Sequence, residues 1–292
     1  MATYNNILVV GATGYLGQHI IKTLLDTNQR FTALARNKGK LLSIGVSDAH
    51  IIEAQVTKPD QLVGICQGVD VVISCLGITR QQDGLSYMDV DYQANLNVLL
   101  EAERAGVTRF VYVSAFKAKS YPQVRLLAVK EKFAARLLSS TKLSPCVIRP
   151  NGFFVDLEEF CRMATQGKVY QFGDGAMKMN PIDGQDLAKF CLAKIDSDEQ
   201  EFDVGGPEVL TLNQIAHLAF ESQGKLVSIR SVPDVFRRIL LGCIKKIPEK
   251  WAGPAEFFLT MLGSDAIAPY YGERKLGEHF SAYYQQQLDK SD

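Results

Sequence analysis

The chain has 292 residues, of which 47% are hydrophobic and 22% charged, a composition typical of a globular protein that buries a full core. Its 32 basic residues balance its 32 acidic residues, so no broad positive field favours nucleic acid, which we exclude as a partner. The sequence has no run of about 18 consecutive apolar residues, and we therefore expect no transmembrane segment.

The chain start and the cysteines indicate where the protein works. The first residues, Met-Ala-Thr-Tyr-Asn-Asn, contain no basic stretch, so we expect no secretory signal and a cytoplasmic protein. The cysteines stand singly among apolar residues without histidine at ligand spacing, and we predict small buried side chains and no metal site. They are Cys66, Cys75, Cys146, Cys161, Cys191 and Cys243.

Short β-branched runs alternate with amphipathic segments in the first half of the chain. The predicted strands cover 7–10, 31–35, 51–52, 71–74, 110–113 and 146–148, and the predicted helices cover 19–25, 92–105 and 130–138. This alternation requires crossover connections, which predicts an α/β fold with a doubly wound parallel sheet over residues 1–150.

The second half has a looser pattern, which we interpret as a smaller C-terminal substrate lobe over residues 151–292, partly interleaved with the sheet domain. We expect turns at 172–175 and 204–207, a strand at 179–182, and helices at 184–194 and 213–222. Asp183 and Asp186 could act as an acid/base pair, but the position of Asp183 before a helix favours an N-cap.

Three glycines stand where the first strand gives way to the first helix. Gly11, Gly14 and Gly17 are spaced for a tight turn, a close approach to a pyrophosphate, and close packing of helix on strand. Anionic phosphates bind well at such a helix N-terminus. We therefore predict a Rossmann-type dinucleotide site; its residues at this turn are Gly11, Ala12, Thr13, Gly14, Tyr15, Leu16 and Gly17.

The end of the second strand indicates which dinucleotide binds. It reads Leu-Ala-Arg-Asn-Lys over 34–38, without the carboxylate that would accept the ribose hydroxyls of NAD. Arg36 can pair with a 2′-phosphate instead. The sequence thus predicts NADP(H) as the cofactor.

Longer motifs resemble one protein family. The three-glycine spacing, the run 69–77 ending in Leu76-Gly77, and the run 105–114 resemble the atypical short-chain dehydrogenase/reductases, an NAD(P)-binding Rossmann group that includes NmrA-like proteins. Residues 90–94, 149–154, 172–175, 181–188, 205–207 and 271–280 resemble the branch that includes divinyl chlorophyllide 8-vinyl reductases. The resemblance covers the whole chain. It implies NADPH-dependent reduction, with Cys75, Leu76 and Gly77 at the cofactor.

The resemblance also implies catalytic residues, and it is incomplete at one of them. Extended members of the superfamily have a serine after the fifth strand and a Tyr-x-x-x-Lys on the next helix. Ser114 matches the serine and Lys130 the lysine, but Leu126 occupies the tyrosine position. Lys130 can hold the nicotinamide ribose, and Tyr121 is a candidate substitute for the proton donor, although a tyrosine before Pro122 also fits a surface loop.

Two further segments are candidates for contact with ligands. Pro150, Asn151 and Phe153 follow the sixth strand at the carboxyl edge of the sheet, and we expect them at the nicotinamide end. Residues 235–259 combine apolar stripes with basic pairs. We favour a plain amphipathic helix packed on the substrate lobe there, over a lid for an apolar substrate or a peripheral membrane contact.

The leading functional prediction is an NADPH-dependent oxidoreductase that transfers hydride to a conjugated double bond or carbonyl of a small molecule. The alternative, which Leu126 keeps open, is a non-catalytic NADP(H)-binding redox sensor or assembly factor of NmrA-like type. A sugar-nucleotide epimerase is disfavoured because such enzymes generally use the tyrosine. The substrate stays open, because its pocket is built from side chains that vary on a shared frame.

Overall fold

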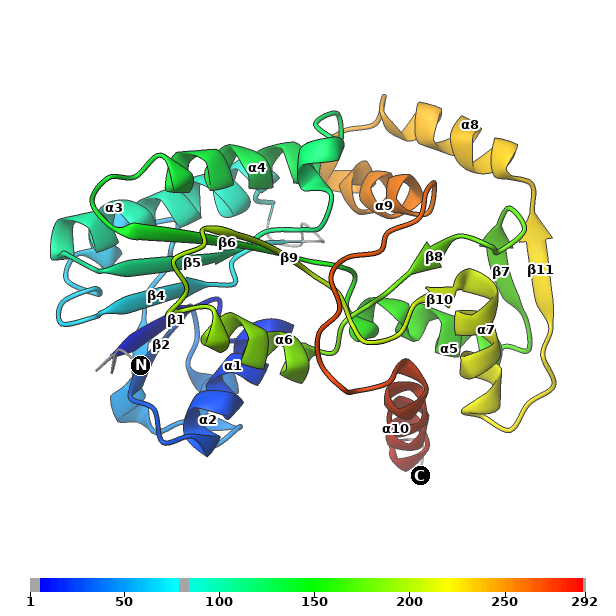
Figure 1. Ribbon diagram of the computed structural model, residues 1–292, viewed down its shortest axis with the longest axis horizontal. Helices are drawn as coiled ribbons and strands as arrows, with labels where there is room; N and C mark the ends of the chain where they lie inside the picture. The colour runs from blue at the N-terminus through cyan, green and yellow to red at the C-terminus, as the bar shows by residue number, and fades with distance from the viewer. Residues whose placement is uncertain (1–5, 79–83, 291–292) are drawn as a thin grey trace. The chain divides into compact units, whose positions relative to one another are not determined.

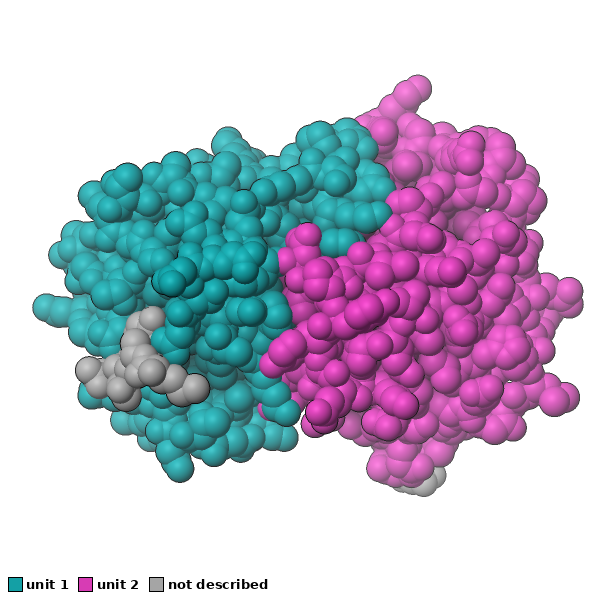
Figure 2. Space-filling view, in the orientation of Figure 1, with its two compact units in different colours: residues 1–149, 187–202 teal, residues 150–186, 203–292 magenta. Residues whose placement is uncertain are grey.

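The computed structural model describes residues 6–78 and 84–290. The chain divides into two compact units, which are coloured separately in Figure 2. Unit 1 comprises residues 1–149 and 187–202, and unit 2 comprises residues 150–186 and 203–292. The chain therefore leaves unit 1 after the sixth strand of its sheet and returns to it once.

A seven-stranded sheet organises unit 1, with the strand order β3-β2-β1-β4-β5-β6-β9. Its strands are β1 (Ile7–Val10), β2 (Phe31–Ala35), β3 (Ile51–Glu53), β4 (Val71–Ser74), β5 (Arg109–Val113), β6 (Ser144–Pro150) and β9 (Glu201–Val204). The pairs from β3 through β6 are all parallel. The order proceeds outward from β1 in both directions, which confirms the predicted doubly wound α/β fold.

Helices cover both faces of this sheet. They are α1 (Tyr15–Asp26), α2 (Gly39–Leu42), α3 (Asn95–Ala105), α4 (Arg125–Leu138) and α6 (Gly184–Ala193), with short turns η1 (Asp48–His50), η2 (Pro59–Leu62) and η4 (Ala118–Ser120) and a π-helix η3 (Met88–Ala94). In Figure 1, α3 and α4 lie on one face of the sheet, and α1 and α2 lie on the other.

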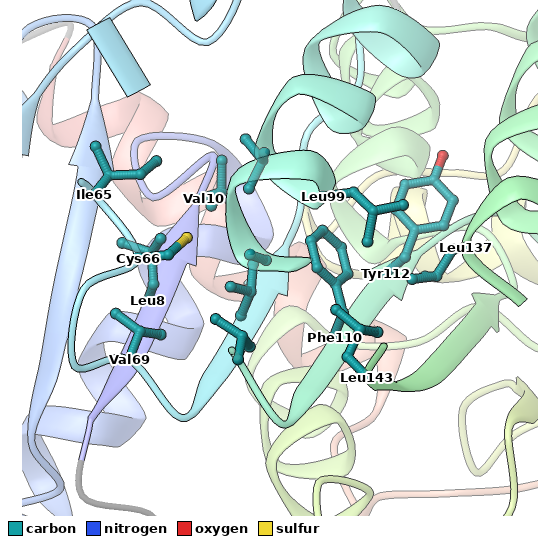
Figure 3. Close-up of a cluster of buried hydrophobic side chains, with 14 of the residues drawn as sticks. Leu8, Val10, Ile65, Cys66, Val69, Leu99, Phe110, Tyr112, Leu137 and Leu143 are labelled. Atoms are coloured by element: carbon teal, nitrogen blue, oxygen red, sulfur yellow. The ribbon is translucent and has the colours of Figure 1, made fainter. Parts of the chain in front are cut away.

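The core between the sheet and α3–α4 is built from apolar side chains at helical spacing on the helices and from the strand residues that face them. Figure 3 shows Phe110 and Tyr112 of β5 grouped with Leu99 of α3 and Leu137 of α4. The ring of Tyr112 meets that of Phe133 edge-on at 4.7 Å between centroids, a favourable aromatic geometry. This packing fixes α4, which carries the predicted catalytic lysine, on the sheet.

Unit 2 is built around a second core. Its elements are η5 (Phe154–Leu157), α5 (Glu158–Thr165), β7 (Val169–Phe172), β8 (Lys178–Met179), β10 (Leu210–Thr211), α7 (Leu212–Glu221), β11 (Ile229–Val232), α8 (Asp234–Ile244), α9 (Glu249–Met261) and α10 (Leu276–Asp289). Strands β7 and β11 pair in parallel, and β8 and β10 pair antiparallel. Apolar faces of α5, α7 and α10 pack together in this core.

Two sequence-based expectations were wrong. The strand predicted over 179–182 is shorter: β8 ends at Met179, because Pro181 has no N–H for a ladder, and Ile182 forms an isolated bridge with Phe153 instead. The cysteines are not all buried, since Cys243 is exposed on α8 and Cys75 is half-buried. Cys243 shares an exposed face of α8 with Phe236, Ile239 and Leu240, so apolar neighbours in the sequence did not indicate its burial.

Candidate functional site

The turn between β1 and α1 requires glycine at two positions. Gly11 has a φ of +80°, in the left-handed region, and a Cβ there would lie 3.0 Å from the carbonyl carbon and oxygen of Cys75. A Cβ on Gly17 would lie 2.2 Å from the carbonyl oxygen of Gly11. The turn therefore packs tightly against both α1 and the chain that follows β4.

The N-terminus of α1 fits an anionic group. Gly14, the N-cap, is exposed and has no side chain that could accept from the first helical N–H groups. The first turn, Tyr-Leu-Gly-Gln, has no acidic side chain, and the helix dipole favours negative charge at this end. The Gln18 side chain donates to the Thr13 carbonyl at 2.9 Å and holds the turn in shape. These features fit a pyrophosphate.

The other predicted residues of the turn have different surroundings. Ala12 and Leu16 are buried, so a dinucleotide would meet their backbone rather than their side chains. Tyr15 is half-buried, with its ring edge-on to His19 at 4.8 Å between centroids. The turn thus offers mainly backbone groups to a ligand.

An exposed cation follows β2. Arg36 is exposed one residue beyond the strand that pairs with β1. Nearby, Lys38 pairs with Asp48 at 2.8 Å, and the Glu53 carboxylate accepts from the Lys38 amide at 3.2 Å. The position and exposure of Arg36 fit contact with a 2′-phosphate, which stays a prediction.

A buried ion pair lies beside the chain that follows β4. The Lys130 ammonium is 2.9 Å from Asp91 Oδ1, and their side chains are 12% and 0% exposed. A Cβ on Gly77 would lie 2.8 Å from each of these two atoms. Because Gly11 approaches Cys75 and Leu76, the phosphate turn, residues 75–77 and Lys130 form one continuous site.

The environment of this pair keeps Lys130 charged. Burial, the largest single influence, lowers the pKa of the Lys130 ammonium, but the interactions with Asp91 and Tyr112 together outweigh burial and raise the pKa above 10.5. Burial raises the pKa of the neighbouring Cys75 thiol to about 12, so this cysteine is neutral. The site therefore contains a fixed cation and no thiolate at Cys75.

The π-helix η3 positions Asp91. Its Oδ2 accepts from the Ile78 amide at 3.2 Å, and its carbonyl accepts from the Asn95 side chain at 3.0 Å. Asn95 in turn accepts from the Ser74 hydroxyl of β4 at 2.6 Å. Single-turn π-helices occur often at functional sites, and this one ties the carboxylate to the sheet edge. Sequence reasoning missed Asp91, although it stands inside the 90–94 motif.

Ser114, directly after β5, belongs to a second hydrogen-bond network, which includes Glu131 of α4. Its hydroxyl donates to Glu131 Oε1 at 2.9 Å. Arg149 donates to both oxygens of Glu131, at 2.9 and 2.8 Å, and to Glu201 Oε2 at 2.8 Å. Lys119 also pairs with Glu201. The sequence analysis named Ser114 but missed Glu131, which accepts from it, and Glu201, which joins the network through Arg149.

The vacant tyrosine position lies in the core. Leu126 is buried one helical turn before Lys130 on α4. Tyr121, the candidate substitute, follows η4 and is half-exposed. Its role as a proton donor stays a prediction.

The residues expected at the nicotinamide end begin unit 2. Pro150 is the buried last residue of β6, and Phe153 is half-buried. The Asn151 side chain donates to Asn180 Oδ1 at 2.8 Å and to the Ala266 carbonyl at 2.6 Å, and it accepts from the Gly152 amide at 2.9 Å. This amide therefore already holds segments of unit 2 together.

The acidic pair of unit 2 has structural roles. Asp183 Oδ1 accepts from the Gln185 amide at 2.8 Å, which confirms the predicted N-cap. Asp186 Oδ2 accepts from the amides of Glu273 and Arg274 at 2.9 and 3.0 Å. A Cβ on Gly272 would lie 2.2 Å from that oxygen, so the 271–280 motif is a docking point for Asp186.

Residues 172–175 form the predicted turn. They line a surface hollow of about 250 Å³ within unit 2, together with Asp234 and residues 262–265. Among residues 6–78 and 84–290, no three His, Cys, Asp or Glu side chains gather as metal ligands.

Comparison with known proteins agrees with this geometry. Residues 11–198 match the model of a family described as NAD(P)H-binding. The chain belongs to this NAD(P)H-binding family. The match confirms the predicted cofactor class and the Rossmann-type fold.

Relatives of this NAD(P)H-binding protein have diverse names. It is 28% identical to the chloroplastic divinyl chlorophyllide a 8-vinyl-reductase of Cucumis sativus, over 95% of this chain and 68% of that protein. It is 27% identical to the photosystem II assembly factor Ycf39 of Synechocystis sp., over 80% of this chain and 72% of that protein. These relatives confirm the branch that the motifs indicated.

A solved structure shares the fold. The NADPH-dependent quinone oxidoreductase QOR2 of Escherichia coli, complexed with NADPH, superposes with a TM-score of 0.73 at 19% identity, over 95% of this chain and 99% of that chain. At this identity the likeness shows the fold alone. Within the described parts of this NAD(P)H-binding protein, no helix has the length and apolar character needed to cross a bilayer.

Proposed function

We propose that this protein is a cytoplasmic NADPH-dependent reductase that transfers hydride to a conjugated double bond or carbonyl of a small, apolar molecule. The observation that carries the proposal is the buried Lys130–Asp91 pair, with its ammonium against Gly77 in the same site as the phosphate turn. Burying a charge costs desolvation energy, so it requires a compensating partner. Buried charges with such partners concentrate at functional sites.

The residues divide the work of binding. Residues 11–17 would hold the pyrophosphate through backbone N–H groups, and Arg36 would hold the 2′-phosphate. Lys130 would donate to the nicotinamide ribose, with residues 75–77 beside the nicotinamide. Bound NADPH supplies the hydride in this chemistry. The protein's own contribution would be to orient the cofactor and the substrate and to supply the positive charge of Lys130.

Ser114 acts as a positioning group in this proposal. Its hydroxyl proton is engaged by Glu131, and Arg149 holds both oxygens of Glu131, so Ser114 presents lone pairs rather than a proton. A substrate or nicotinamide amide N–H could donate to it. The proton that completes the reduction then comes from water near Lys130 rather than from Tyr121.

A second candidate function is a non-catalytic NADP(H)-responsive assembly factor or redox sensor. Leu126, buried at the tyrosine position, favours it, as does the similarity to a protein named as an assembly factor. Both functions require the cofactor site. They differ in whether bound NADPH is consumed.

Turnover separates the two functions. NADPH oxidation, followed at 340 nm, is measured with quinones, enones and aldehydes as acceptors. For any accepted substrate, Lys130→Met is expected to lower kcat by roughly 10²-fold or more, and Tyr121→Phe is expected to change it less than about threefold. The contrast reflects the place of Lys130 in the site and the loop position of Tyr121.

A folding control is needed because Lys130→Met leaves Asp91 buried without its cation. Lys130→Arg keeps the charge, and the double variant Asp91→Asn/Lys130→Met removes both charges, so both should melt nearer the wild type. If Tyr121→Phe is the damaging change, the proton donor is a relocated tyrosine. If NADPH binds but no acceptor is reduced, the reductase proposal is wrong and the assembly-factor function is the better account.

A further inference from the structure

The helix α8 packs with an unusual polarity. Its inner face carries Arg237, Leu241 and Ile244, and Ile244 packs with Ala252 and Leu259 of α9. Arg237 is buried, where it donates to the Leu259 carbonyl at 2.8 Å and pairs with Asp234. One residue of a type that usually faces solvent, Arg237, is thus turned inward on this helix.

The outer face of α8 is apolar. Phe236, Ile239, Leu240 and Cys243 recur at intervals of three and four residues, so they share one face, and all are exposed. The exposed fractions of Phe236 and Ile239 are 55% and 57%. Single exposed apolar residues are ordinary, but a continuous stripe on one helix marks a contact surface.

A basic segment continues this stripe. Lys245 and Lys246 are exposed in the connection to α9, and at the start of α9 Lys250 is exposed and Trp251 is 75% exposed. Residues 234–251 contain five basic and two acidic side chains, whereas the whole chain is neutral. Positive charge is therefore concentrated beside the apolar stripe.

We propose that the α8 surface, defined as Phe236, Ile239, Leu240, Cys243, Lys245, Lys246, Ile247, Lys250 and Trp251, docks this protein on an anionic lipid membrane. An interfacial helix places apolar residues below the headgroups and lysines among them, and tryptophan favours that boundary. With 11 residues, α8 is about 16 Å long, far too short to span a bilayer, so it lies in the plane of the interface.

Charge favours lipid over a second copy of the chain. A two-fold symmetric contact through α8 would bring the same basic cluster of two copies together. An anionic membrane instead offers the opposite charge along the whole surface. This proposal is independent of the reductase proposal, since it rests on unit 2 residues alone.

Vesicle binding tests the proposal with the full-length protein. Co-flotation is measured with vesicles of 3:1 phosphatidylcholine to phosphatidylglycerol and with pure phosphatidylcholine, at low and high salt. Trp251 is the chain's single tryptophan, so its emission reports on this surface directly. We expect binding to the anionic vesicles, weakened by salt, with a blue shift of Trp251 emission and quenching by brominated acyl chains.

Variants locate the contact. Ile239→Ser removes one inserted side chain and should weaken binding roughly tenfold or more, and Lys245→Gln/Lys246→Gln should weaken it about fivefold for each charge. The matched control is Leu226→Ser, which changes a 95% exposed leucine in the loop between α7 and β11, outside the α8 surface. NADPH affinity should be unchanged in all of them.

Three results would overturn the proposal. One is absence of flotation with anionic vesicles, and another is flotation without any change in Trp251 emission. The third is equal weakening by Leu226→Ser and Ile239→Ser. The protein could instead sediment as a dimer that Ile239→Ser dissociates, without binding to vesicles. In that case a second copy of the chain covers the stripe.

Discussion

Removing the Asp91 carboxylate tests the electrostatics of the candidate site most directly. Asp91→Asn keeps the size of the side chain but leaves the Lys130 ammonium, only 12% exposed, without its partner at 2.9 Å. Breaking a buried pair from one side costs about 3 to 5 kcal/mol. For a unit of this size that lowers the melting temperature by roughly 6 to 20 °C. Calorimetric melting at pH 7 measures the loss.

The pH dependence identifies the cause. In the wild type the pKa of Lys130 lies above 10.5, so its contribution to stability is fully present at all pH values below 10.5. Without Asp91, burial lowers that pKa below its unfolded value, and the unfolded chain then binds more protons than the folded chain. The stability of Asp91→Asn should therefore rise between pH 7 and pH 10, which narrows the gap to the wild type.

Two controls accompany this measurement. Asp89→Asn changes an exposed carboxylate of the same π-helix, which accepts from Ser86, and should cost about 1 kcal/mol or less. Asp91→Asn/Lys130→Met removes both charges and should recover most of the loss. If Asp91→Asn melts within about 2 °C of the wild type, or the gap stays constant up to pH 10, the carboxylate does not hold the charge of Lys130.

Three more predictions follow from the site and the surface. Arg36→Ala should weaken NADPH binding by roughly 1.5 to 3 kcal/mol and leave NADH binding unchanged in calorimetry; equal wild-type affinities for the two would refute the NADP preference. Gly14→Val should melt near the wild type yet lose NADPH binding, because Gly14 is exposed at the anion site. Gly17→Ala should instead be destabilised by roughly 1 to 3 kcal/mol, because its Cβ would lie 2.2 Å from the Gly11 carbonyl oxygen. A thiol reagent should modify one exposed cysteine rapidly in the native protein, and Cys243→Ser should abolish this fast phase.

The elements of the fold were predictable because their signals are local. Alternating β-branched runs and amphipathic segments predicted the strands of the sheet, and the three glycines predicted a tight turn between β1 and α1. The helical segment predicted from residue 92 begins earlier, at Met88, with the π-helix η3. The sequence did not indicate this start, because the wider turn of a π-helix does not follow the 3.6-residue period of an α-helix. The position of Asp91 in the site could not be predicted for the same reason, because Asp91 stands in this π-helix.

The partners in the site could not be read from the sequence. Glu131 and Arg149 are 18 residues apart and stand on α4 and β6, so only the packing of helix on sheet brings them together. Cys243 shows the opposite failure. An apolar neighbourhood in sequence predicts burial only if the apolar residues face inward, and on α8 most of them, Cys243 included, are exposed.

The raised pKa of Lys130 also restricts the chemistry that the proposed reductase can perform. A general acid works best when its pKa lies near the working pH, and an ammonium held above 10.5 gives up its proton poorly. In the proposed reductase, Lys130 would therefore act as a fixed positive charge that stabilises the negative charge developing during hydride transfer. Reduction of an isolated aldehyde produces an alkoxide, a strong base that needs a proton as it forms. Reduction of an enone or quinone instead produces a conjugated anion, which is a weaker base than an alkoxide. Such an anion can be released from the site and then take its proton from water. A site with a fixed cation, an engaged serine and Leu126 in place of tyrosine is thus better suited to conjugated acceptors than to simple carbonyls.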